Sequence, residues 1–172
     1  MELLIPGLII VALMVWASTK IKRISAAAFE PEVIEMPLYS IQKPDGFLHI
    51  LNDESGLDFR AYSRELETIG RLDYRTATIE VEIFDRKTLE ERISEIRAFS
   101  QEISVSNYLD GGERSAIVRN RRKIDNAEYA ETRKIITRDG RLIELRVAVL
   151  EDRAEDFSAK VEQIIEGFTM KV

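Results

Sequence analysis

Hydrophobic and polar residues follow two different periods along this chain, and the change between them predicts its elements. From Thr76 to Phe84 apolar and polar residues alternate, which is typical of a half-buried antiparallel strand. The same alternation, weaker in places, predicts strands over residues 38–42, 47–51, 57–64, 115–118, 127–136 and 142–150. Outward positions on two of these strands are expected for Thr78, Glu80, Glu82, Glu144 and Arg146. The face of Glu80 and Glu82 is interpreted as solvated, with a protein–protein contact as the alternative.

Two segments have helical spacing instead. Apolar residues recur every three or four positions over 87–101, where Thr88 and Glu91 form a capping box. A second amphipathic helix is predicted over 154–166, ending at Gly167. Between the two long strands before it, Asp139-Gly140 predicts a tight hairpin. Together these elements predict an α+β domain with one antiparallel sheet and two helices that cover one of its faces.

The N-terminal residues form an apolar stretch without the polar positions of the predicted strands and helices. Residues 3–18 carry no charge and are followed by Lys20, Lys22 and Arg23. A helix of about 17–25 apolar residues crosses a bilayer, so one N-terminal transmembrane helix is predicted. Its apolar side chains are those of Leu3, Leu4, Ile5, Leu8, Ile9, Ile10, Val11, Leu13, Met14, Val15 and Trp16.

The charges around this stretch predict its fate and orientation. A cleaved signal peptide would begin with basic residues, whereas this chain begins Met1-Glu2. A retained anchor is therefore preferred, with a cleaved signal and a buried helix of a soluble protein as the alternatives. The basic residues after the span predict an inner-membrane, single-pass protein with its N-terminus outside and its C-terminal domain in the cytoplasm.

Three regions follow from this organisation. Residues 1–23 are the predicted anchor, and residues 24–37 are a predicted stalk that contains Pro31 and Pro37. Residues 38–172 form the folded domain, which is long enough to bury a core.

Composition limits the chemistry of this domain. The net charge of −6 argues against nucleic acid as a partner. The one basic run is Arg119, Arg121, Arg122 and Lys123, interrupted by Asn120. It is interpreted either as a solvated loop or as a contact with anionic lipids or an acidic partner.

No catalytic, cofactor or metal site is predicted. The chain has one histidine and no cysteine, a poor donor set for zinc, copper or iron. His49 stands within a predicted strand, without a nucleophile setting around it. Asp110-Gly111-Gly112-Glu113 lacks the lysine and hydroxyl of a phosphate-binding loop. We therefore expect a non-enzymatic protein without a cofactor.

Several motifs resemble the PsbP-like family, which includes DcrB-type lipoproteins. Pro44-Asp45-Gly46-Phe47 resembles the family's entry motif, and Ile164 to Phe168 resembles its closing block. The strand around Ile79 and the helix over 89–99 stand in the corresponding order, so the resemblance covers about residues 38–170. It implies an antiparallel sheet with packed helices and a supporting role in a larger membrane complex. Family members usually lie outside the cytoplasm, so no functional residue is carried over.

The leading hypothesis is thus a non-catalytic accessory, assembly or stabilising subunit of an integral membrane protein complex. The transmembrane helix and the soluble domain would both contact the partner, and membrane lipids would surround the anchor. An energy-transducing or photosynthetic complex enters only through the resemblance. The alternative is a membrane-tethered module that binds a lipid or another small ligand.

Overall fold

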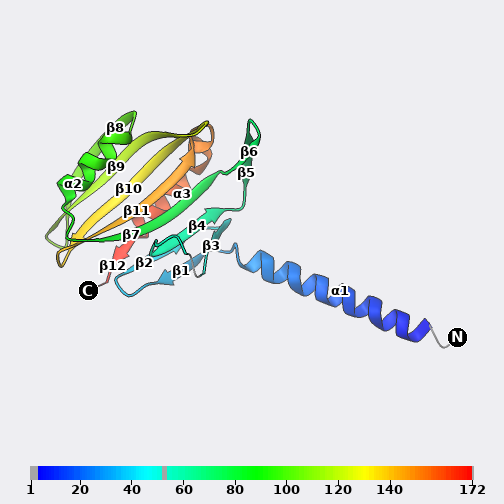
Figure 1. The fold of residues 1–172 in the computed structure, drawn as a ribbon. Coiled ribbons are helices and arrows are strands. Elements are labelled where there is room, and N and C mark those ends of the chain that lie inside the picture. The colour runs from blue at the N-terminus through cyan, green and yellow to red at the C-terminus, as the bar shows by residue number, and fades with distance from the viewer. Residues whose placement is uncertain (1–3, 52–53, 172) are drawn as a thin grey trace.

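The computed structural model describes residues 4–51 and 54–171 of the chain. Three α-helices, a short 3-10 helix and twelve strands occur within them (Figure 1). The helices are α1 (Leu4–Ala27), α2 (Leu89–Phe99), α3 (Ala154–Glu166) and the 3-10 helix η1 (Glu151–Arg153). The strands are β1 (Glu32–Glu35), β2 (Tyr39–Lys43), β3 (Phe47–His49), β4 (Phe59–Ser63), β5 (Leu66–Ile69), β6 (Leu72–Arg75), β7 (Ala77–Asp85), β8 (Glu102–Asp110), β9 (Glu113–Ile124), β10 (Ala127–Arg138), β11 (Arg141–Leu150) and β12 (Thr169–Met170).

An antiparallel sheet of seven strands forms the centre of the fold. Its order is β3-β4-β7-β11-β10-β9-β8, and every neighbouring pair is antiparallel. Arg138 pairs with Arg141 across the predicted two-residue turn, where Asp139 and Gly140 have φ of 50° and 73°. Positive φ at both positions is what such a hairpin requires. The α+β class and the hairpin are therefore confirmed.

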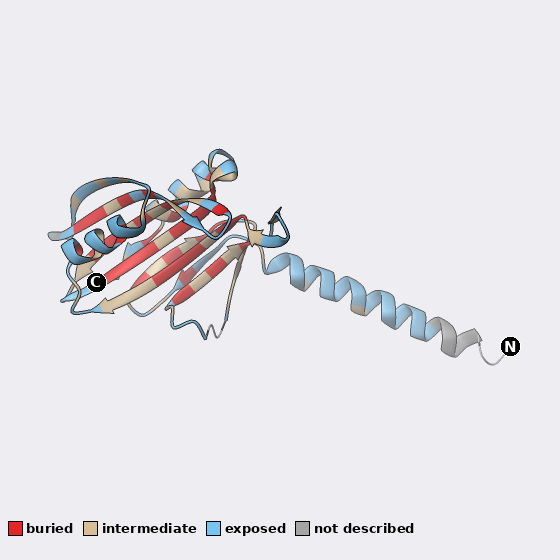
Figure 2. Ribbon diagram, turned by 45° about the horizontal axis from the view of Figure 1, so that its top comes forward, coloured by how far each residue is buried: buried red, intermediate tan, exposed pale blue. Residues whose placement is uncertain are grey.

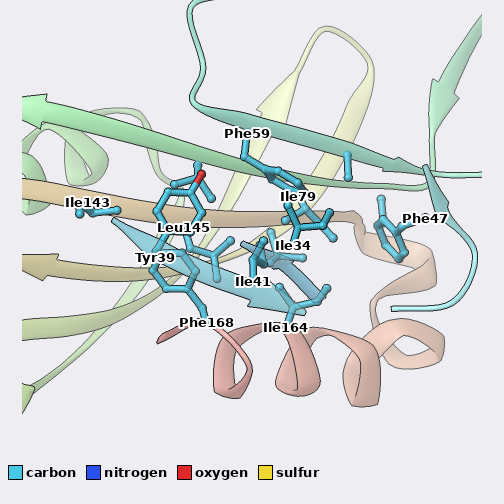
Figure 3. Packing of buried hydrophobic residues seen from close by; sticks show 14 of the residues in the cluster. Ile34, Tyr39, Ile41, Phe47, Phe59, Ile79, Ile143, Leu145, Ile164 and Phe168 are labelled. Carbon is cyan, nitrogen blue, oxygen red and sulfur yellow. The ribbon is translucent and has the colours of Figure 1, made fainter. Parts of the chain in front are cut away.

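One face of this sheet carries the main apolar core. Alternate residues of β7 and β11, including Ile79 and Leu145, point toward α3 and toward the small sheet β1-β2-β12 (Figure 3). Tyr39 and Phe168 meet there with ring centroids 5.1 Å apart. The predicted helix over 154–166 is present with the same bounds. Ile164 is its fully buried contact to this core.

The opposite face is covered in part by α2, so the prediction that both helices lie on one face is wrong. Figure 1 shows α2 and α3 on opposite sides of the sheet. Leu89 and Ile96 of α2 pack on Val118, Ile135 and other residues of the second face. The capping box of Thr88 and Glu91 is present as predicted. Sheet alternation shows that a strand has two faces, but it does not show that one of them is solvated.

Several strands were missed or displaced by sequence reasoning. β8 and the β5-β6 hairpin were not predicted, and β9 extends well beyond the predicted residues 115–118. The expected stalk over 24–37 contains the end of α1 and the whole of β1. β1 pairs with β2 through Ile34 and Ile41, and Ile34 joins the core. This segment is therefore part of the folded structure.

α1 projects away from the sheet domain (Figure 1). Over the residues described, no helix combines the length and the apolar content needed to cross a bilayer, so the predicted transmembrane helix is not supported.

Candidate functional site

α1 carries most of the exposed large apolar side chains of the described residues. Eight large apolar side chains along α1 are each more than half exposed, and seven of them occupy residues 9–11 and 13–16. Consecutive positions point in all directions around a helix, so the apolar surface runs around α1 rather than along one stripe. Figure 2 shows this part of α1 as exposed along its length. The eight are Ile9, Ile10, Val11, Leu13, Met14, Val15, Trp16 and Ile21.

Some predicted anchor residues remain outside this description. Leu3 lies outside the described residues, and the side chains of Leu4, Ile5 and Leu8 are not among those described. A helix that is apolar on all sides is found buried in a larger protein or in a membrane. The surface of α1 therefore needs a covering that the domain does not provide.

A basic and aromatic boundary follows the apolar part of α1. Lys20, Lys22 and Arg23 are all exposed. The Nζ atom of Lys20 lies 5.0 Å from the ring centroid of Trp16. An indole ring beside cations is the arrangement that membrane proteins place at the lipid headgroups.

The junction between α1 and the sheet is pinned by Lys43. This side chain is 1% exposed and donates hydrogen bonds to the backbone carbonyls of Phe47 at 2.9 Å, Ala28 at 3.3 Å and Glu30. The backbone N–H of Gly46 donates to the carbonyl of Phe29 at 2.8 Å. Burial lowers the pKa of Lys43, partly offset by nearby carboxylates such as Glu32. Ala28 to Glu30 are therefore held against β2 and β3.

The basic run does not form a loop, nor a single basic patch. It lies in β9, where Arg119 and Arg121 point to the α3 face and Arg122 points to the other. Arg121 pairs with Glu151 at 2.8 Å. Arg122 stacks over Phe99, with its guanidinium carbon 4.6 Å from the ring centroid. Lys123 is exposed on the side of Arg121. The solvated-loop interpretation is wrong, because strand pairing splits these charges between two faces.

A groove lies beside Arg119 on the α3 face. Its volume is about 350 Å³, and its apolar floor includes Ala130, Val149, Val161 and Ile165. Arg119 stands on the sheet side, and Glu162 and Glu166 on the helix side. Arg119 forms no ion pair with the described residues. The groove can thus take an apolar chain next to one free guanidinium.

A buried charge network on the α2 face was not foreseen from the sequence. Arg133, 1% exposed, binds both Glu131 and Glu144, which are equally buried. Arg92 of α2 closes the network with a 2.5 Å ion pair to Glu144. Asn120 donates to Glu131 at 2.9 Å. The expectation that Glu144 faces outward is therefore wrong.

Glu80 extends this network toward β4. It is 8% exposed and binds Arg146, and its other oxygen lies 3.5 Å from Nε of Arg60. The prediction of a solvated Glu80 is wrong for the same reason. Each buried carboxylate of the network has an arginine partner, which is the arrangement of a structural network rather than of an acid–base pair.

His49 lies in β3, as predicted, and its ring centroid is 4.6 Å from that of Phe59. Burial lowers the pKa of His49, and Glu32 and Lys43 act on it with opposite signs. Within the described residues no group of three or more histidine, cysteine or carboxylate side chains is placed to hold a metal ion.

Solved structures with a similar fold include two bacterial proteins. Cyanobacterial PsbP (CyanoP) from Synechocystis sp. PCC 6803 aligns with a TM-score of 0.57 over 83% of this chain and 94% of its own, at 15% identity. LpqN from Mycobacterium tuberculosis aligns with a TM-score of 0.59 over 83% of this chain and 91% of its own, at 11% identity. The chain has a PsbP-like fold.

The predicted resemblance is thus confirmed for the fold of the PsbP-like domain. No family model and no curated protein matches the sequence. At these identities the likeness concerns the fold alone, so the function of the PsbP-like domain has to be argued from its own surfaces.

Proposed function

We propose that this protein is a non-catalytic accessory subunit of an integral membrane complex. In this proposal α1 attaches the protein to the membrane and to the complex. The observation that carries the proposal is the uncovered apolar surface around α1, next to the basic residues Lys20, Lys22 and Arg23. Burying apolar surface yields about 25 cal/mol per Å². A covering of lipid tails and partner helices is therefore strongly favoured over water.

The rest of the chain supports a binding role rather than catalysis. The carboxylates of the α2 face are paired with arginines, and the one histidine stacks on Phe59. LpqN, which has a similar fold, is involved in cell envelope biogenesis. The resemblance to the PsbP-like family makes an energy-transducing complex the partner to look for first. In this proposal the PsbP-like domain stays on the cytoplasmic side and contacts the partner, while α1 enters the bilayer.

Single-cysteine labelling tests the attachment directly, because the chain has no cysteine of its own. In membranes, a water-soluble maleimide should label Ser158→Cys on exposed α3 quickly and Met14→Cys on α1 slowly. Detergent extraction or unfolding should expose both sites equally. Equal labelling of the two sites in intact membranes would contradict the proposal.

A second function is favoured by the groove beside Arg119. Its apolar floor and free guanidinium fit a single-chain amphiphile with an anionic head. The fluorescent probe anilinonaphthalene sulfonate should therefore bind the full chain, and Ala130→Trp should abolish this signal by filling the groove. Arg119→Gln should weaken binding, whereas Arg122→Gln on the opposite face should not. Equal effects of the two glutamine variants would contradict this function.

A further inference from the structure

β8 is one of the two edge strands of the seven-stranded sheet, and the three-residue β3 is the other. Among the strands that the structure describes, only β9 pairs with β8, and this pairing runs without interruption from Glu102 opposite Arg121 to Asp110 opposite Glu113. The backbone N–H and C=O groups of β8 that point away from β9 therefore have no strand partner within the described chain. Such an edge is a ready template for another strand.

This edge lacks the features that usually block strand addition. Natural edge strands carry proline, lysine, inward-pointing charges or a bulge. The nine residues of β8 contain no proline, lysine or arginine, and their register with β9 has no bulge. The seven residues from Ile103 to Leu109 are uncharged. A segment of this kind favours cross-strand pairing.

One face of β8 is apolar and the other is polar, and this difference predicts which side chains a partner strand should carry on each face. Ile103 and Val105 point to the α2 face and pack against its apolar cluster. Ser104 and Ser106 point to the other face and are exposed. An added strand would continue both layers if apolar residues alternated with small hydroxyl residues.

The ends of β8 exclude a second copy of this chain as the preferred partner. In an antiparallel pairing of two β8 strands that uses all nine residues, Glu102 of each copy would face Asp110 of the other. Like charges directly opposite one another destabilise a strand pair. Glu102 does meet Arg121 at 3.3 Å, but both side chains are more than half exposed, and such a pair is weak.

We infer that β8 is a docking edge for an extended segment of another protein, with alternating apolar and hydroxyl residues between two basic ends. The basic ends would lie opposite Glu102 and Asp110, and the backbone of the segment would extend the sheet. This interaction surface is separate from α1. It provides a contact through the PsbP-like domain. If the peptide experiment below fails, the proposed role of α1 is unaffected.

A designed peptide tests this inference on the full chain in detergent micelles. The probe is Lys-Val-Thr-Val-Thr-Val-Thr-Val-Lys with a fluorescent label, which places valine opposite Ile103 and Val105 and threonine opposite Ser104 and Ser106. Binding is measured by fluorescence anisotropy. The same peptide with glutamate at both ends should bind about fivefold more weakly, because two favourable cross-strand charge pairs become repulsive. The lysine-ended peptide with all central amides N-methylated should not bind. Hydrogen exchange should slow in residues 102–110 when the probe is bound.

Charge reversal supplies the matched variants. Glu102→Lys with Asp110→Lys should invert the preference, so that the glutamate-ended peptide binds more tightly. Glu54→Lys with Glu155→Lys makes the same change of net charge at two exposed positions outside β8 and should leave the preference unchanged. Identical preferences in both double variants, or exchange in residues 102–110 that the probe does not alter, would overturn the inference. A dimer that protects these residues without peptide would identify a second copy as the occupant and also overturn it.

Discussion

Arg133 is held in the interior of the domain by two buried carboxylates, so its replacement should destabilise the fold. Arg133→Met would leave Glu131 and Glu144 without their shared partner inside the protein. Removing one partner of a buried ion pair costs about 3–5 kcal/mol. We expect a loss of this size in the free energy of unfolding, measured by urea denaturation.

Arg141→Met is the matched control on the neighbouring strand β11. Arg141 pairs with Asp85 at 3.3 Å, and both side chains are more than half exposed. An exposed pair contributes about 0–1 kcal/mol, so this variant should unfold almost like the wild type. Equal losses in the two variants would contradict the assignment of the buried network as a major determinant of stability.

Lys43 has the corresponding role at the base of α1. Lys43→Met removes hydrogen bonds to the backbone carbonyls of Ala28, Glu30 and Phe47, which join the end of α1 to β3. We expect a loss of about 2–4 kcal/mol in the free energy of unfolding, with faster hydrogen exchange in residues 28–35. Lys160→Met removes one exposed hydrogen bond to the carbonyl of Asp45 and serves as the control. Unchanged exchange in residues 28–35 of Lys43→Met would argue against a pinned junction.

His49 provides a prediction for pH. Burial lowers its pKa in the folded state below the ordinary value of 6.5, so the unfolded chain binds the extra proton more readily. Stability from neutral His49 is therefore present above pH 6.5 and is lost as the pH falls toward its folded-state pKa. The wild type should lose more stability than His49→Gln between about pH 7 and 5. Parallel stability curves for the two proteins would contradict this.

The burial of individual charged side chains is not predictable from the strand pattern alone. Glu80 and Glu144 occupy the polar positions of an alternating pattern, and their assignment to outward positions followed from that pattern alone. Their burial depends on Arg92, Arg133 and Arg146, which come from three different elements. Charge pairing across strands depends on the register, which a single strand pattern does not contain.

At the scale of elements, α1 yields the most direct prediction. Val11→Asp puts a charge in the middle of the apolar surface of α1, and a charge at the centre of a membrane helix costs about 2.5–3.5 kcal/mol on insertion scales. We expect the protein to shift from the membrane fraction to the soluble fraction without a change in the unfolding of the PsbP-like domain. Leu72→Asp, at an exposed apolar position in the β5-β6 hairpin, should leave the distribution unchanged. An unchanged distribution for Val11→Asp would count against attachment by α1.

Strongly periodic elements were predictable, and weakly patterned ones were not. The alternation of apolar and polar residues around Ile79 and Val147 predicts β7 and β11, and the capping box at Thr88 predicts the start of α2. In β8 the alternation is interrupted at Asn107, and it was overlooked. β1 has only four residues next to Pro31, a length too short for a strand pattern to stand out from a stalk. Its pairing with β2 is a tertiary contact that a local pattern does not report.

At the scale of the whole molecule, two surfaces leave the PsbP-like domain with unmet contacts. α1 presents apolar side chains on all sides, and β8 presents unpaired backbone groups at the far edge of the sheet. Figure 1 shows the helix and this edge at opposite sides of the domain. In the proposed complex, membrane helices of the partner cover α1, and an extended segment of the partner pairs with β8.

The native mass of the protein in its own membranes tests the central claim most directly. The tagged full chain is extracted in mild detergent and separated on a native gel, and the co-migrating proteins are identified by mass spectrometry. We predict one defined complex much larger than the 19.8 kDa chain, containing integral membrane proteins. Replacement of α1 by an unrelated apolar helix should release the chain from it. Migration of the wild type as a free monomer in detergent would contradict the account.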